Sequence, residues 1–143
     1  MKFLLLAFIF SLPALGVGYT RMGFSPTPNF EFMKVPDSQT TDATETVIHS
    51  MTLPDPATWI VKVSCEARKS DGSKREGFIK TALVYRSGGG AVIEGSVVNA
   101  FVQSGLDYDM TIGVSSNDFE IKVTGAASDT VDWRCVMEQQ KLE

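Results

Sequence analysis

Few side chains of this 143-residue chain are of the kinds that carry out catalysis or bind metal ions. The chain holds one histidine, His49, and two cysteines, Cys65 and Cys135, too few for a multi-histidine site or a four-cysteine zinc site. A histidine that acts as a general base also needs a nucleophile and an orienting acid, and no G-x-S-x-G motif is present. We therefore expect His49 to be structural, the protein not to be an enzyme, and no cofactor to be bound.

The two cysteines fall on predicted inward-facing positions of strands, Cys65 on an early strand and Cys135 on the last. If those strands are neighbours, the two Cβ atoms approach within about 3.5 to 4.5 Å, as a disulfide requires. Two free buried cysteines that act as small apolar side chains produce the same pattern. A disulfide between Cys65 and Cys135 is therefore one of two open alternatives.

A calcium site is the metal site to consider, because Asp107, Asp109 and Asp118 lie close together in the sequence and Ca²⁺ binds carboxylate oxygens. The spacing matches no EF-hand loop. Alternation instead places Asp107 and Asp109 on the outer face of a strand, where solvated charges are common. We expect no metal site.

Four basic residues surround a predicted hairpin tip at Asp71-Gly72, namely Arg68, Lys69, Lys74 and Arg75. They could contact a phosphate or an acidic neighbour. A charged tip that keeps an exposed hairpin soluble is the favoured interpretation.

Phosphate binding and nucleic-acid binding are not expected elsewhere in the chain. Thirteen Lys and Arg against seventeen Asp and Glu give a formal net charge of −4, which disfavours affinity based on phosphate neutralisation. The glycines at 88–90 lack the G-x-x-x-x-G-K-[ST] form and join two predicted strands, so they form a turn rather than a phosphate loop.

Short alternating segments separated by turn residues must position these side chains, and they predict an all-β fold. The predicted strands are residues 46–53, 59–67, 78–86, 91–102, 108–114, 119–123 and 131–137. A glycine within the fourth, Gly95, predicts a bend. We expect an antiparallel β-sandwich of about seven strands, jelly-roll-like, with an extended N-terminal arm.

Inward-facing positions predict the core. Trp59, Val63, Cys65, Trp133 and Cys135 are expected there, with Trp133 facing Trp59. The first strand places Val47, His49, Met51 and Leu53 on one face by the same alternation.

Residues 1–18 differ from the rest of the chain, because Lys2 is followed by an apolar run over 3–12, Pro13 and small residues. This layout is that of a secretory signal peptide with a cleavage site after Gly16. An apolar arm that docks on partner subunits is the second alternative. A membrane anchor is the weakest, because Pro13 ends the run well short of the about 20 apolar residues that a span needs.

Residues 19–42 predict an extended connector that contains Pro26, Pro28 and Pro36, and 43–139 predict the β-sandwich. Aromatic side chains dominate interface energetics, so the phenylalanines of the N-terminal region are the expected docking residues. They are Phe3, Phe8, Phe10, Phe24, Phe30 and Phe32.

Residues of about 40–138 resemble a small β domain that recurs in structural proteins of tailed bacteriophages. The segments that carry the resemblance are Thr41-Asp42-Ala43-Thr44 with Thr46, Met51-Thr52-Leu53-Pro54, Val61-Lys62-Val63, Ala67-Arg68-Lys69-Ser70-Asp71-Gly72, Tyr85-Arg86, Gly88-Gly89-Gly90-Ala91, Ile121-Lys122-Val123-Thr124-Gly125-Ala126-Ala127 and Val131-Asp132-Trp133-Arg134. The ending "VTGAA…W" is the most distinctive, and its Gly125 is expected to permit a backbone turn. The apolar run over 3–12 is not a feature of that domain.

The resemblance implies a virion structural protein of the tail, its fibres or a head-associated part, which packs and binds rather than catalyses. Its expected partners are other virion proteins and further copies of itself, with a trimer as the first expectation, and a host surface is a further candidate. Nucleic acid and membrane are not expected partners. The alternative is a secreted or periplasmic β-sandwich binding module with a cleaved signal peptide.

Overall fold

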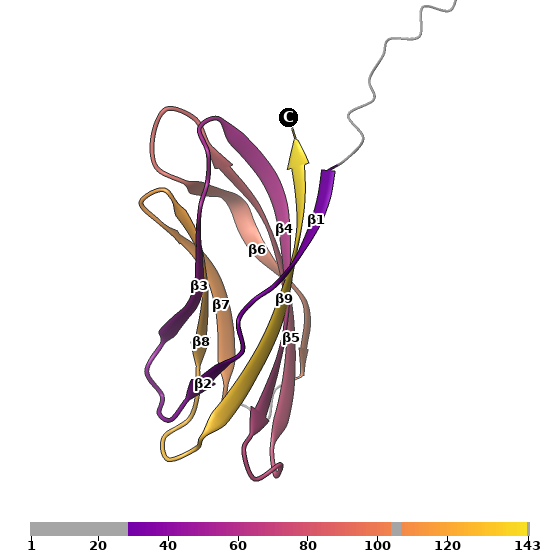
Figure 1. Cartoon of the computed structure of the whole chain (residues 1–143), viewed down its shortest axis with the longest axis vertical. Helices are drawn as coiled ribbons and strands as arrows, with labels where there is room; N and C mark the ends of the chain where they lie inside the picture. The colour runs from indigo at the N-terminus through magenta and orange to yellow at the C-terminus, as the bar shows by residue number, and fades with distance from the viewer. Residues whose placement is uncertain (1–28, 104–106, 143) are drawn as a thin grey trace, which may run out of the picture.

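Residues 29–103 and 107–142 are described by the computed structural model, and they form nine strands (Figure 1). In chain order the strands are β1 (Asn29–Lys34), β2 (Ser38–Thr40), β3 (Thr46–Thr52), β4 (Ala57–Lys69), β5 (Arg75–Arg86), β6 (Val92–Gln103), β7 (Asp109–Ser115), β8 (Asp118–Thr124) and β9 (Val131–Leu142). All seven strands expected from alternation are among them.

Two antiparallel sheets pack face to face, which confirms the predicted β-sandwich. The larger has the order β1-β9-β4-β5-β6, and β2 also pairs with β9. The smaller has the order β3-β8-β7. The sheets are thus unequal, six strands against three, whereas a jelly roll divides eight strands between its two sheets. The upper end of the sandwich, in the view of Figure 1, holds the start of β1 and the end of β9, and the lower end holds the β4–β5 turn.

The central strand β4 shows why the sequence folds in this way. Its odd-numbered residues from Ala57 to Ala67 are buried, and the residues between them are exposed or half-buried. Side chains alternate between the two faces of a strand, so one row of β4 contacts the smaller sheet and the other faces outward. β9 alternates in the same way from Val131 to Gln139.

Strands β1 and β2 lie within the range expected to be a connector, and both pair with β9. Between them Val35 is fully buried, and its backbone N–H donates to the carbonyl of Cys135. Alternation did not reveal β1, because its apolar residues Phe30 and Phe32 point outward and are 50% and 77% exposed. The pairing with β9, more than 100 residues later, creates this strand.

All five residues expected in the core are buried, but the two tryptophans are far apart. Trp133 lies opposite Ala67 on β4 and Trp59 lies opposite Lys141, eight residues further along the strand. At about 3.3 Å per residue this separates them by about 26 Å, so the prediction that Trp133 faces Trp59 is wrong. Trp133 instead packs against Phe78 and Tyr108, with ring centroids 6.0 and 6.3 Å away.

Two strands carry register shifts that interrupt alternation. In β3 the shift lies between Val47 and His49, so that Ile48 and Met51 pack on the core while Val47 is 47% exposed. The expectation that Val47 shares the core face is therefore wrong. In β6 the expected irregularity at Gly95 is present as a positive φ of 73° beside a register shift with β5.

Gly125 is required by close packing and not by a turn conformation. Its φ is not in the positive region, in contrast to the expectation from sequence. A Cβ at this position would instead lie 2.5 Å from Oγ1 of Thr40 and 2.8 Å from the carbonyl oxygen of Asp42. Thr40 is buried, and its Oγ1 accepts a hydrogen bond of 3.0 Å from the indole N–H of Trp133. The glycine thus permits the loop that anchors the buried tryptophan.

Candidate functional site

Exposed apolar side chains gather on one face of the molecule, the outward face of the six-stranded sheet. Eight large apolar residues are exposed among the described residues, and seven of them belong to this sheet. These seven, here called the apolar outer face, are Phe30, Phe32, Ile60, Val92, Val98, Val136 and Leu142. The eighth, Val47, lies on the smaller sheet.

The strand register shows that these side chains share a face. Residues directly opposite one another in neighbouring strands point to the same side of a sheet. Phe30 lies opposite Gln140, which lies opposite Ile60, and Ile60 lies opposite the half-buried Leu83. Phe30 and Ile60 are therefore two strands apart, about 10 Å at the usual strand spacing.

The same register extends the apolar outer face toward the upper end and toward β6. Leu142 lies opposite Thr58, Thr58 opposite Tyr85, and Tyr85 opposite Val92. Val98 lies opposite Thr81. In an ordinary sandwich the outward residues of each strand are polar, so several large exposed apolar side chains on one sheet face favour an interaction site. Polar residues lie among them, since Glu138, Lys62 and Thr81 stand in the row between Phe32 and Val98. The arrangement can bind another apolar surface.

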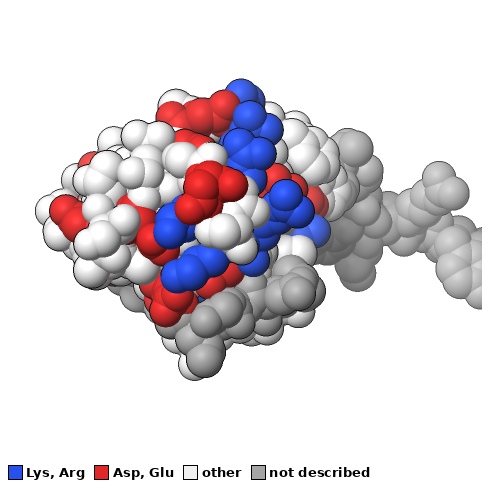
Figure 2. All heavy atoms as spheres, turned by 90° about the horizontal axis from the view of Figure 1, so that it is seen from below, with Lys and Arg blue, Asp and Glu red and all other residues white. Residues whose placement is uncertain are grey.

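The lower end of the sandwich is different, because charged residues of both signs alternate there (Figure 2). At its centre the carboxylate of Asp129, only 7% exposed, accepts hydrogen bonds from three side chains. The Nζ of Lys69 lies 2.7 Å away, the Nζ of Lys74 3.1 Å away, and the hydroxyl of Tyr108 3.1 Å away. Lys74 also pairs with Asp107. We call these residues the Asp129 cluster.

The pKa values in the Asp129 cluster follow from these contacts. Hydrogen bonds from Lys69 and then from Lys74 lower the pKa of Asp129 to about 2. The pKa of Lys74 is raised, first by its hydrogen bond to Asp107 and then by that to Asp129. The pKa of Lys69 is raised by Asp129, and that of Tyr108 is raised by burial and by its hydrogen bond to Asp129. These shifts favour the charged forms of Asp129, Lys69 and Lys74 and the neutral form of Tyr108.

The basic residues of the predicted hairpin tip therefore divide into two kinds. Lys69 and Lys74 point to Asp129 and join the β4–β5 turn to the segment before β9. Arg68 and Arg75 are exposed and lie on the outward face of the larger sheet. Lys69 and Lys74 are more than 50 residues from Asp129 in the sequence, and this separation explains why their shared partner was not identified from sequence. No pattern in the sequence identified Asp129 as this partner.

Cys65 and Cys135 are bonded to one another. They lie directly opposite in β4 and β9, with an S–S distance of 1.99 Å and a Cα–Cα distance of 4.1 Å. Both are buried at the inner face. Of the two alternatives left by the sequence, the structure has the disulfide, and it joins two central strands across 70 residues of sequence.

The remaining polar candidates from the sequence, Asp109, Asp118 and His49, do not form a common site. Asp109 pairs with Lys80, and Asp118 accepts hydrogen bonds from Ser50 and Thr52. Within the described residues no three His, Cys, Asp or Glu side chains are placed to share a metal ion. His49 is half-buried on β3, and desolvation lowers its pKa.

The glycine turn at 88–90 contacts protein groups. The backbone N–H of Gly88 donates to the carboxylate of Asp55, 3.0 Å away, and the guanidinium of Arg86 donates to the carbonyl of Gly89. A Cβ at Gly90 would lie 2.9 Å from the carbonyl oxygen of Ser116. These contacts hold the upper-end loops together.

Two of the six expected docking phenylalanines belong to the apolar outer face, namely Phe30 and Phe32 on β1. The other four, Phe3, Phe8, Phe10 and Phe24, lie outside the described residues. Across residues 29–103 and 107–142 there is no helix long and apolar enough to span a bilayer.

Comparisons with known proteins find no matching family model and no matching curated protein. Two solved structures are similar in part. The tailspike protein of Acinetobacter baumannii phage AM24 is 8% identical with a TM-score of 0.47, over 79% of this chain and 26% of that one. The tailspike protein of Acinetobacter phage vB_ApiP_P1 is 14% identical with a TM-score of 0.34, over 99% of this chain and 24% of that one. The chain thus spans about a quarter of the length of either tailspike protein.

Proposed function

We propose that this protein is a structural component of a phage virion, of its tail or an associated part, which works by packing rather than by catalysis. The apolar outer face carries this proposal, because seven of the eight exposed large apolar side chains of the described residues share one sheet face. The resemblance of residues of about 40–138 to virion structural proteins supports the proposal that the protein is part of a virion. In the particle, neighbouring subunits cover this face.

The position of the chain ends supports docking on the same side. Asn29, the first residue of β1, pairs with Lys141, which precedes Leu142 of the apolar outer face. The described chain therefore begins at the upper end of the sandwich, beside Phe30. The arm and the face can engage the same neighbouring subunits, which include further copies of this chain, with a trimer as the expected state.

Substitutions on the two sheets test the proposed role of the apolar outer face. Phe32→Ser with Val98→Ser removes two large exposed apolar side chains from the larger sheet, and Val47→Ser is the matched control on the smaller sheet. We expect the double variant to fold with an unchanged Tm, to lose self-association in analytical ultracentrifugation, and to be missing from purified particles. Normal incorporation of the double variant, or equal loss with Val47→Ser, would refute the proposal.

Truncation tests the arm. The cut belongs after residue 28, because β1 is part of the sheet and Val35 is buried in the core. We expect a chain that begins at Asn29 to fold and to fail to join particles. Incorporation of this truncated chain at the normal copy number would show that the arm does not dock.

A secreted or periplasmic binding module is the second candidate, and the disulfide between Cys65 and Cys135 is the observation that favours it. Disulfides persist in secreted and periplasmic proteins, and also on virion surfaces. N-terminal sequencing of the native protein separates the two candidates. Val17 at the N-terminus supports export with removal of residues 1–16, whereas Met1 supports a retained docking arm.

A further inference from the structure

Most basic side chains of the described residues have a carboxylate partner, including Arg86 with Asp55 at 3.8 Å and Arg134 with Asp37 at 4.0 Å. Each described lysine has a carboxylate within 4.0 Å, as the ion pairs of Lys34, Lys62, Lys69, Lys74, Lys80, Lys122 and Lys141 show. The chain as a whole is acidic, with a net charge of −4. Carboxylate partners are therefore plentiful, and a basic group without one is informative.

Arg68 and Arg75 have no such partner among the described residues. They lie directly opposite one another in β4 and β5, both exposed on the outward face of the larger sheet. Like charges directly opposite in neighbouring strands destabilise a sheet. The pair therefore costs folding free energy and receives no compensating ion pair from the described chain.

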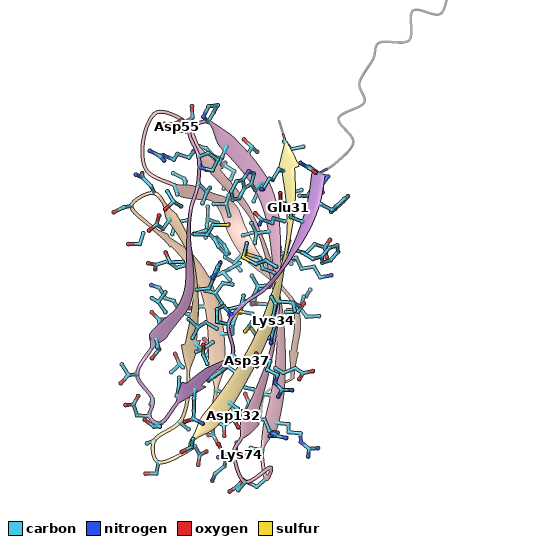
Figure 3. The ribbon with its side chains drawn as sticks, in the orientation of Figure 1. Glu31, Lys34, Asp37, Asp55, Lys74 and Asp132 are labelled. Carbon is cyan, nitrogen blue, oxygen red and sulfur yellow. A yellow bond between two sulfur atoms is a disulfide. The ribbon has the colours of Figure 1, made fainter. Side chains whose placement is uncertain are left out.

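A third arginine extends this basic surface. Arg134 on β9 lies opposite Glu66, two residues along β4 from Arg68. Its guanidinium is 74% exposed on the side-chain scale and approaches Asp37 only to 4.0 Å. A hollow beside Arg68 and Arg134 is lined by these two arginines, by the carboxylates of Asp37, Glu66 and Asp132, and by Ser38, Gln39 and Trp133. Figure 3 places Asp132 at the lower end, away from Glu31 and Asp55 at the upper end.

The carboxylate directly opposite Arg68 in the strand register is already engaged. Asp132 lies opposite Arg68 in the strand register, but its oxygens accept hydrogen bonds from Nε2 of Gln39 at 2.8 Å and from Oγ of Ser70 at 3.3 Å. The guanidinium of Arg68 consequently keeps its donors free toward the outside. Planar guanidinium groups bind carboxylates in a bidentate manner.

We propose that Arg68, Arg75 and Arg134 bind an acidic segment of a partner protein in extended conformation. Along a strand, Arg134 and Arg68 are displaced by two residues, about 7 Å, which is also the distance between alternate side chains of an extended peptide. In a peptide with carboxylates at alternate positions, one carboxylate can therefore pair with Arg68 and Arg75 and the next with Arg134. Backbone groups of the central strands are already paired, so the recognition is by side chains.

Interleaved carboxylates favour this ligand over a polyphosphate. Glu66 and Asp132 lie on the same surface as the arginines, and they would repel the closely spaced charges of a nucleic acid. Glu66 lies opposite Arg134 and Asp132 lies opposite Arg68, so both carboxylates stand beside the arginines. A peptide whose carboxylates are about 7 Å apart places fewer negative charges against them than a polyphosphate does. The site adjoins the apolar outer face, because Val136 is the next outward-facing residue of β9 after Arg134.

Binding of a synthetic peptide of alternating Glu and Thr to the full chain tests this proposal. Fluorescence anisotropy at low salt is measured for the natural chain and for Arg68→Gln with Arg75→Gln. We expect the affinity of the double variant for the peptide to fall by about tenfold or more, because charge-assisted hydrogen bonds are lost. Lys34→Gln with Lys62→Gln is the matched control, because it removes the same charge from the same sheet face at lysines that have partners.

Thermal unfolding provides the second readout. Because Arg68 and Arg75 repel one another, Arg75→Gln should leave the Tm unchanged or raise it, whereas a structural arginine would lower it. Three results would overturn the proposal: a lower Tm for Arg75→Gln, equal weakening of binding in the lysine control, or binding of hyaluronate or duplex DNA in preference to the acidic peptide. A peptide of alternating Gln and Thr should not bind.

Discussion

The two faces of the six-stranded sheet have opposite environments: the inner face is buried in the core, and the outer face is exposed. Adjacent residues of one strand therefore lie in different surroundings. On β9, Met137 is fully buried at the inner face, and its neighbour Val136 is 52% exposed at the outer face. Among the polar groups at the inner face, Oγ1 of Thr40 accepts a hydrogen bond from the indole N–H of Trp133, whereas Oε1 of the buried Gln139 has no partner within the described residues. Apolar groups at the outer face have no cover among the described residues.

Because of this difference, we expect inner-face side chains to determine the stability of the fold and outer-face side chains to determine association with other subunits. Inner-face side chains are buried in the core, so their truncation leaves a cavity and lowers the free energy of unfolding. Outer-face side chains contribute little to folding, because they stay in contact with water. A protein selected only to fold would carry polar residues there, so the outer face is where binding to other subunits is expected.

The largest expected effect is at the inner face. Trp133→Ala removes a fully buried side chain that packs on Phe78 and Tyr108, and we expect the free energy of unfolding to fall by about 3 to 5 kcal/mol. Urea unfolding followed by circular dichroism measures it. A change below about 1 kcal/mol would show that the inner face is not a packed core.

The disulfide is expected to come next. Cys65→Ala with Cys135→Ala opens a link across 70 residues, and the chain-entropy estimate for a loop of that length is about 4 kcal/mol, a value that engineered bonds often do not reach. Urea unfolding of the natural chain with and without reductant should reproduce the loss, and the variant should not respond to reductant. An equal response of both proteins would contradict this prediction.

Gly125→Ala should have a smaller effect. The added Cβ would meet Oγ1 of Thr40 and the carbonyl of Asp42, and overpacking of this kind costs about 1 to 3 kcal/mol. Gly113→Ala is the control, because nothing lies within 4 Å of a Cβ there. If the two variants had equal Tm values, close packing at Gly125 would not matter.

Acid should weaken the lower end through Asp129. Since the pKa of Asp129 is lowered to about 2, its carboxylate stabilises the fold fully above the ordinary pKa of about 4. That contribution is lost as the pH falls through about 2. We expect Asp129→Asn to lower the Tm at neutral pH and to reduce the fall in Tm between about pH 4 and pH 2. Identical acid profiles for both proteins would argue against the Asp129 cluster.

The smallest effect is expected at the outer face. Val136→Thr should change the free energy of unfolding by less than about 0.5 kcal/mol, while Met137→Ala, one residue along the strand, should cause a clear loss. Chemical unfolding of the two variants side by side compares the faces directly. A large loss from Val136→Thr would mean that the outer face is covered within the chain.

Much of the fold was predictable because alternation is local. The seven strands from β3 to β9 were found from period-two patterns alone, and Trp59, Val63, Cys65, Trp133 and Cys135 were placed in the core. The register between strands was not predictable, since it depends on pairs distant in the sequence. This is why Trp133 was assigned to the wrong partner and why the bulge at Val47 was missed.

The candidate site was less accessible to sequence reasoning. Phe30 and Phe32 were singled out as aromatic residues suited to docking, but nothing in the sequence indicated that they share a face with Val98, which is 66 or more residues away. Likewise Arg68, Lys69, Lys74 and Arg75 were grouped at one hairpin tip, and only the fold separates the two lysines that reach Asp129 from the two arginines that do not.

The sequence by itself determined the class of fold, an antiparallel β-sandwich, because side-chain alternation and turn residues act over a few neighbouring positions. It also determined that only one histidine and two cysteines are present. The tertiary structure alone decided that Cys65 and Cys135 are bonded, that Gly125 makes room for Thr40, and that most exposed apolar side chains of the described residues share one sheet face. Those outcomes depend on strand order and register, which are set by the combined burial of all strands rather than by any one of them.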